Sequence, residues 1–172
     1  MRNLVMSVIG DDRPGLVSAL SDAVSANGGN WERSRLAQLA GKFAGIVVVA
    51  VPQDRSGELI DAVTNLEGLL EVVVHSAGAS VARAGDWSSL TIGVLGNDRP
   101  GIVHELSAAL SASGVTIEKM ITGTRDAPMA GGMLFEAQLD VLVPPDADVA
   151  TIRADLERIA DELLVDLGID GV

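Results

Sequence analysis

Two stretches of the chain place a large hydrophobic residue at every second position. They are Leu4, Met6 and Val8 near the N-terminus, and Leu90, Ile92 and Val94 near the middle of the chain. A period of two is the pattern of a β-strand with one buried face. The sequence therefore predicts that each half of the chain opens on a half-buried strand.

Each predicted strand is followed by hydrophobic residues at helical spacing. These residues share one stripe of a helix and are Leu16, Leu20 and Val24 in the first half, and Ile102, Leu106 and Leu110 in the second. We expect the first helix to begin at Pro14, which is tolerated in a first helical turn, with Asp12 near the N-cap position. The Asn27-Gly28 pair predicts its end. The second half repeats these features, with Pro100, Asp98 and Ser113-Gly114.

The two halves are copies of one another at an offset of 86 residues. The segment Ile9–Val17 (Ile-Gly-Asp-Asp-Arg-Pro-Gly-Leu-Val) recurs at Leu95–Val103 as Leu-Gly-Asn-Asp-Arg-Pro-Gly-Ile-Val. Over positions 9–32 the two copies are identical at 13 of 24 positions. Internal similarity of this extent indicates a duplicated structural unit.

The remainder of each copy predicts two further strands, a helix and a last strand. In the first copy we expect a strand near 30–39, a tight turn at Gly41-Lys42, a strand over 46–51, a helix carrying Leu59 to Leu66, and a strand over 72–75. The second copy repeats this order, with strict alternation over 135–143, a helix over 149–163 and a last strand near 165–169. Each copy therefore has the order βαββαβ.

This order predicts the α+β class, as two ferredoxin-like βαββαβ domains. Right-handed crossovers return both helices of such a unit to the same side, so each antiparallel sheet carries its helices on one face. We expect domains at residues 1–77 and 88–172, joined by a linker over 78–87, where small residues follow no helical or strand period. Because pairing hides edge strands, we also expect a homodimer.

The charge of the chain argues against direct contact with nucleic acid. The formal net charge is -12, of which residues 1–86 contribute -3 and residues 87–172 contribute -9. Such a charge repels a phosphate backbone. With no Tyr, two Phe and two Trp, the chain also has few rings on which a base could stack. We therefore expect no direct binding of nucleic acid.

The cysteine count and the length of the apolar runs indicate where in the cell the protein is located. The chain has no Cys, which excludes a disulfide framework, a thiolate metal site and a thiol nucleophile. No run reaches the roughly 20 apolar residues of a membrane span, and the N-terminus lacks the pattern of a signal peptide. These features predict a cytoplasmic protein without membrane contact.

The motifs resemble those of a known family. They are the doubled Asp-Arg-Pro-Gly, the segment Ser34–Phe43 in the first hairpin, and Ile117-Glu118, Thr122, Pro128, Gly131 and Leu134-Phe135 in the second copy. In these motifs the chain looks like two ACT domains in tandem and resembles the glycine cleavage system transcriptional repressor family over essentially its whole length. The resemblance implies a regulator of amino-acid metabolism that binds a small amino acid, with glycine and serine as candidates, and acts through a protein partner, either a regulator or an enzyme.

The turn ahead of each first helix is the candidate ligand site. The first N–H groups of a helix are unpaired and attract a carboxylate, while a nearby Asp or Asn accepts from an ammonium group. We expect backbone amides near Gly15 and Gly101 to bind the carboxylate of the ligand, where two modules or two chains meet. The predicted acceptors are Asp11, Asp12, Asn97 and Asp98. The alternative is that the second aspartate of each motif only caps its own helix and that the glycines only permit close packing.

We predict no catalytic site, metal site or cofactor. Arg13 and Arg99 could pair with a ligand carboxylate, but because they stand beside aspartates they are interpreted as solvated or ion-paired arginines. His75 and His104 are too few for a metal site without Cys or carboxylates at ligand spacing. The acidic residues within 146–162 predict a solvated helix face, or a patch that a basic partner contacts.

Two other functions stay open at this point. The chain could be a structural dimerisation module without a working ligand site. It could also be the regulatory ACT component of an amino-acid-metabolism enzyme such as a phosphoserine phosphatase or a formyltetrahydrofolate deformylase, which carry similar copies. Those enzymes need a further catalytic region, for which the residues after Val165 leave no room, so we expect a non-enzymatic sensor.

Overall fold

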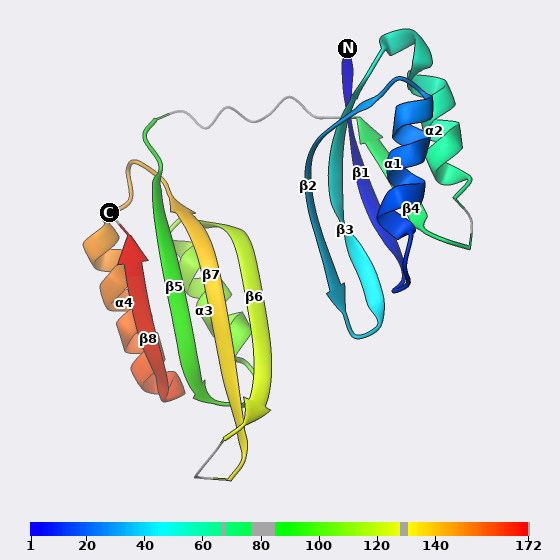
Figure 1. Cartoon of the computed structure of the whole chain (residues 1–172). Coiled ribbons are helices and arrows are strands. Elements are labelled where there is room, and N and C mark those ends of the chain that lie inside the picture. The colour runs from blue at the N-terminus through cyan, green and yellow to red at the C-terminus, as the bar shows by residue number, and fades with distance from the viewer. Residues whose placement is uncertain (67, 77–84, 128–130, 172) are drawn as a thin grey trace. The chain divides into compact units, whose positions relative to one another are not determined.

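The computed structural model describes residues 1–66, 68–76, 85–127 and 131–171 (Figure 1). Contacts between Cα atoms divide the chain into two compact units, Met1–Ala82 and Arg83–Val172. Most of the linker predicted at 78–87 lies outside the described residues.

The first unit is a four-stranded antiparallel sheet with two helices on one side (Figure 1). Its elements are β1 (Arg2–Asp11), α1 (Leu16–Ala26), β2 (Asn30–Leu39), β3 (Lys42–Val51), the short 3-10 helix η1 (Gln53–Arg55), α2 (Ser56–Thr64) and β4 (Glu71–Ser76). The strand order is β2-β3-β1-β4, and every neighbouring pair is antiparallel. The predicted βαββαβ arrangement is confirmed for this unit.

The second unit repeats the same topology. Its elements are β5 (Ser88–Asn97), α3 (Ile102–Ala112), β6 (Thr116–Asp126), β7 (Met133–Val143), α4 (Val149–Leu163) and β8 (Val165–Gly171). The strand order is β6-β7-β5-β8, again antiparallel throughout. No helix in the described part of the chain is long and apolar enough to cross a membrane.

The core of each unit lies between the sheet and its two helices. It contains all of the residues that the periodicity of the strands and first helices singles out, each at most 3% exposed: Leu4, Met6, Val8, Leu16, Leu20, Val24, Leu90, Ile92, Val94, Ile102, Leu106 and Leu110. Full burial of one such side chain contributes about 1.5–3 kcal/mol. The pattern of hydrophobic residues therefore positions the sheets, and with them the turns that follow β1 and β5.

The first helices begin two residues later than the prolines predict. α1 starts at Leu16 and α3 at Ile102. Each N-cap residue is a glycine in the left-handed conformation, Gly15 with φ 95° and Gly101 with φ 102°. Helical dihedral angles cannot continue through such a residue, so Pro14 and its counterpart lie in the turn and not in the helix.

The first hairpin also turns one residue earlier than predicted. Its two positive-φ residues are Ala40 (50°) and Gly41 (76°), and Lys42 is already the first residue of β3. Two consecutive left-handed residues fit a tight two-residue hairpin turn. This shift places the Lys42 side chain at the end of β1, next to the candidate site.

Candidate functional site

The turns after β1 and β5 are tied to the sheet in the same way. The backbone N–H of Asp12 donates to the carbonyl of Gly41 at 2.9 Å, and that of Asp98 donates to the carbonyl of Met133 at 2.8 Å. Each motif is therefore anchored to the start of the neighbouring strand. The duplication extends to the position of the turn, as well as to its sequence.

The aspartates at positions 12 and 98 do not cap their helices. The N-cap residues are Gly15 and Gly101, and neither helix has a side-chain cap hydrogen bond. The prediction that Asp12 and Asp98 lie near the N-cap is therefore wrong, because the left-handed glycine stands between each aspartate and its helix.

The N-terminus of α1 is open to an approaching group, whereas at α3 a Cβ added at Gly101 would meet a carboxylate oxygen of Glu105 at 3.3 Å. The first helical hydrogen bonds run from Ala19 N–H to the Gly15 carbonyl and from Glu105 N–H to the Gly101 carbonyl, both at 2.9 Å. The amides of residues 16–18 and 102–104 precede these bonds and have no helical partner of their own. A Cβ added at Gly15 would meet nothing within 4 Å. An anion can therefore reach the amides at this end of α1.

An ion pair at the end of β1 distinguishes the first turn from the second. The Lys42 ammonium donates to the Asp11 carboxylate. This hydrogen bond, together with the charge of Lys42, holds the pKa of Asp11 below its ordinary value. In the second unit the corresponding register partners are Asn97 and Leu134. The second turn thus keeps an oxygen acceptor but has neither of the two charges.

A hollow of about 520 Å³ opens beside the first turn. Its polar lining combines the Asp11 and Lys42 pair with Glu71, which lies opposite Ile9 at the start of β4. The Arg13 guanidinium, interpreted above as solvated or ion-paired, donates to the carbonyl of Gly68. The hollow therefore offers carboxylates and one ammonium group at the end of β1, where the turn begins.

The structure gathers the predicted residues of each copy into one turn. Asp11 ends β1, Asn97 ends β5, and the aspartate and glycine of each motif follow within four residues. Sequence reasoning misses Lys42 as a neighbour of Asp11, because the pattern places Lys42 in the hairpin turn. The available signal was its place just after the hairpin glycine, where an antiparallel partner of β1 begins.

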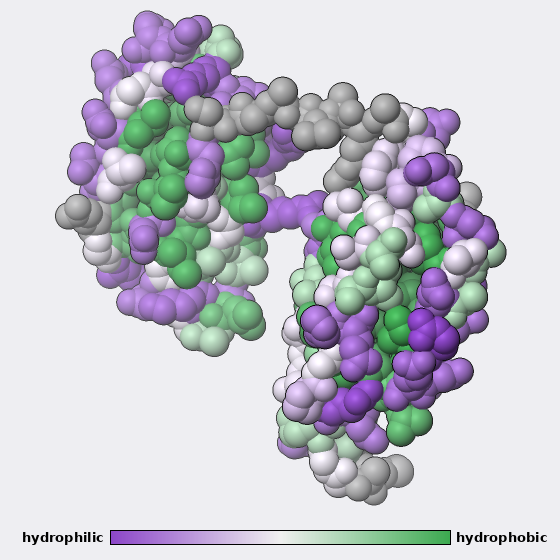
Figure 2. Space-filling view, turned by 180° about the vertical axis from the view of Figure 1, so that it is seen from behind, coloured by the Kyte–Doolittle hydropathy of each residue, from purple (hydrophilic) through white to green (hydrophobic). Residues whose placement is uncertain are grey.

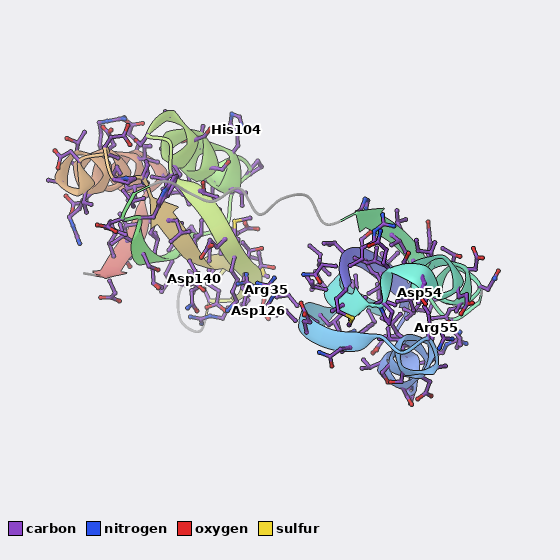
Figure 3. The ribbon with its side chains drawn as sticks, turned by 90° about the horizontal axis from the view of Figure 1, so that it is seen from above. Arg35, Asp54, Arg55, His104, Asp126 and Asp140 are labelled. Atoms are coloured by element: carbon purple, nitrogen blue, oxygen red, sulfur yellow. The ribbon has the colours of Figure 1, made fainter. Side chains whose placement is uncertain are left out.

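The remaining polar candidates are the two histidines and the acidic segment. His75 lies 3.5 Å from the Ser7 hydroxyl on the sheet, while His104 lies on α3, on the side away from Asp140 and the sheet (Figure 3). No group of three or more His, Cys, Asp or Glu suited to a metal ion occurs among the residues described. Asp148 of the acidic segment is the N-cap of α4 and accepts from the backbone N–H of Ala150 at 3.0 Å.

Comparisons with known proteins agree with the duplicated fold. Residues 2–75 and residues 90–161 each match a model of the ACT domain. The chain is 27% identical to the glycine cleavage system transcriptional repressor of Escherichia coli, over 93% of this chain and 85% of that protein. It is 28% identical to the phosphoserine phosphatase SerB2 of Mycobacterium tuberculosis, over 98% of this chain but 40% of that protein. A crystal structure of an unknown protein from Galdieria sulphuraria superposes with a TM-score of 0.83 at 32% identity, covering 99% of this chain and 98% of the other.

Proposed function

The chain belongs to the ACT domain family, and from this we propose that it is a regulatory protein that senses a small amino acid and acts through a protein partner. The observation that carries the proposal is the turn present in both units. Each turn places an Asp or Asn acceptor beside a helix N-terminus that a left-handed glycine leaves uncapped. These are the two chemical features that a zwitterion needs.

The proposed ligand binds with its carboxylate on the helix amides and its ammonium group on the acceptors. In the first unit the carboxylate would bind the amides of residues 16–18, and the ammonium would bind Asp11 and Asp12. In the second unit Asn97 and Asp98 take the place of these acceptors. Because Asp11 already pairs with Lys42 whereas Asn97 is neutral, the two sites should differ in affinity.

Glycine and serine are the proposed ligands. Each has a small side chain, which does not obstruct the contact between the ligand carboxylate and the helix amides. The glycine N-caps likewise leave room for this close approach. The likeness to a protein named as a glycine cleavage system transcriptional repressor supports glycine, and supports a role in controlling that system. The net charge of -12 supports action through a protein partner over direct contact with DNA.

The signal is proposed to pass through an interface. A ligand that lies where two modules or two chains meet can favour one arrangement of that interface over another. A coupling of about 1–3 kcal/mol between the ligand and the partner is sufficient for regulation. The ligand must contact the two arrangements differently for this to work.

A second candidate function is a regulatory component of an amino-acid-metabolism enzyme. The match to SerB2, which spans nearly all of this chain and less than half of that protein, favours it. In both cases the chain itself binds an amino acid, and the two functions differ in the partner. Co-purification of the tagged chain from its own organism distinguishes them, because a transcriptional regulator is expected in the first case and a metabolic enzyme in the second.

Thermal unfolding in the presence of each of the twenty amino acids tests the sensor proposal. A ligand at about 100 times its dissociation constant stabilises the folded state by roughly 2.7 kcal/mol. For a domain of this size that corresponds to an increase in Tm of about 10 °C or more. We expect glycine or serine to give such a shift. If no amino acid shifts the Tm, the sensor proposal is rejected. The alternative of a structural dimerisation module without a working ligand site then stands.

A further inference from the structure

The face of the first sheet that points away from its helices carries exposed apolar side chains beside the polar Ser7, Glu71 and His75. Ile46 on β3, Ser7 on β1 and Val73 on β4 lie in one row across the strands. Ile46 is 54% exposed and Val73 is 49% exposed, and Ile9 in the next row is 45% exposed. Figure 2 shows hydrophobic side chains gathered over this part of the first unit. Contiguous exposed hydrophobic surface of this kind marks an interaction site.

Two arginines border this apolar surface on the edge strand β2. Arg35 lies opposite Ile46 and Arg33 lies opposite Val48, so both belong to the same face of the sheet. Both residues are exposed. The apolar residues together with these arginines are called the first open face below.

The corresponding face of the second sheet is hollow. Gly93 on β5 lies between Gly168 on β8 and Gln138 on β7, so one row of the sheet carries two residues without side chains. A hollow of about 710 Å³ opens over this row. A Cβ added at Gly168 would meet nothing within 4 Å. Figure 1 views the second sheet from this side, which is called the second open face below.

Four carboxylates belong to the second open face: Glu136, Asp140, Asp166 and Asp170. Two of them are paired within the sheet, Glu136 with Arg125 at 3.3 Å and Asp140 with Lys119 at 3.8 Å. The other two flank Gly168 on the edge strand β8, and neither has an ion-pair partner among the described residues. An unpaired carboxylate on each side of a hollow attracts a partner that presents basic side chains around an apolar projection.

We propose that the first open face of one copy docks on the second open face of another copy. With β2 of one copy over β8 of the other, the arginines on β2 meet the unpaired carboxylates on β8, and the projecting Ile46 on β3 enters the hollow over Gly93 on β5. Because each chain carries both faces, two copies related by a twofold axis make this contact twice. The interface goes beyond the sensor function, and it shares only Ile9 with the hollow beside the first turn.

The area of the two contacts is sufficient for a stable dimer. Four strands about 4.8 Å apart and five residues at about 3.3 Å rise give a face of roughly 300 Å². Two contacts hide four such faces, about 1,200 Å² in total, which is the lower end of the range for specific interfaces. A single contact would hide only half of this area and would not suffice.

Filling the hollow tests the interface in the intact chain. Phenylalanine at Gly168 occupies the hollow, while Gly57→Phe on α2 is the matched control, because an added Cβ there also meets nothing within 4 Å. Sedimentation velocity should show the unmodified chain as a dimer, at twice 17.7 kDa. We expect Gly168→Phe to raise the dissociation constant at least about tenfold and Gly57→Phe to leave it unchanged. A monomeric unmodified chain, or a Gly168→Phe dimer of unchanged affinity, would overturn the proposal.

Charge reversal then identifies which faces meet. The variants Arg33→Glu/Arg35→Glu and Asp166→Arg/Asp170→Arg should each be monomeric, since like charges face each other in both contacts. An equimolar mixture should recover the dimer, because one contact of the mixed dimer is native and the other has both charges reversed. Circular dichroism verifies that each variant is folded. If the β8 variant alone stays dimeric, or if the mixture stays monomeric, the two open faces do not meet in the dimer and the proposal is wrong.

Discussion

Alanine in place of Gly15 reveals whether the backbone alone requires a glycine ahead of α1. The added Cβ would meet nothing within 4 Å, so crowding contributes no cost. The φ of 95° remains, and an L-residue in a left-handed conformation costs roughly 1–2 kcal/mol. We therefore expect Gly15→Ala to destabilise the first unit by about that amount, which corresponds to a decrease in Tm of about 4–16 °C for a unit of this size.

Gly57→Ala is the matched control within the same unit. An added Cβ at Gly57 also meets open space, but this residue lies in α2 with ordinary helical backbone. Alanine is preferred over glycine in a helix by up to about 1 kcal/mol, so this variant should be slightly stabilised. Urea unfolding of both variants, followed by circular dichroism, measures the difference. Equal stabilities for the two variants would refute the left-handed conformation of Gly15, and with it the open helix end.

Three further outcomes follow from single contacts. Asp148→Ala removes the N-cap of α4 and should cost the second unit about 1 kcal/mol in thermal unfolding, whereas the exposed Asp146→Ala should cost nothing measurable. The lowered pKa of Asp11 means that its pairing stabilises the protein above about pH 4 and that this contribution is lost as the pH falls through the lowered pKa. Lys42→Met should therefore raise the pKa of Asp11 toward its ordinary value in a carboxyl NMR titration, and an unchanged pKa would contradict the ion pair. Gly45→Ala places a Cβ 2.0 Å from a backbone oxygen of β2 and should destabilise the first unit by about 3 kcal/mol in urea unfolding.

The strands and core helices could be predicted because each has one buried face. Period-two alternation places the buried residues of β1 and β7, and i, i+4 spacing places those of α1, since one side of each element packs on the core. The last strand also alternates, with Val165, Leu167 and Ile169 facing the core, and β8 forms over Val165–Gly171 beside β5. In these elements the hydrophobic pattern of the sequence and the packing of the folded sheet place the same residues in the core.

The details of the site depend on information that local pattern does not hold. A proline and an aspartate ahead of a hydrophobic stripe are ordinary helix-start signals, but at Gly15 the left-handed backbone delays the helix. The pairing of Asp11 with Lys42 depends on the register of β1 with β3, which the length of the hairpin sets. The hollow over Gly93 and Gly168 requires strands distant in sequence to lie side by side. The register between distant strands is set only in the folded sheet, so the local sequence pattern does not predict these contacts.

Calorimetric titration of glycine or serine into glycine-to-asparagine variants tests the central claim most directly. Asparagine tolerates a left-handed backbone, and at Gly15 and Gly101 its side chain stands at the helix end that the ligand carboxylate would occupy. The control places asparagine at Gly28 and Gly114, which have φ of 67° and 69° and lie beyond the opposite ends of the same helices. We predict that the Gly15→Asn/Gly101→Asn variant loses binding while the Gly28→Asn/Gly114→Asn variant keeps the affinity of the unmodified chain. Unchanged affinity in a folded Gly15→Asn/Gly101→Asn variant would show that the amino acid binds elsewhere.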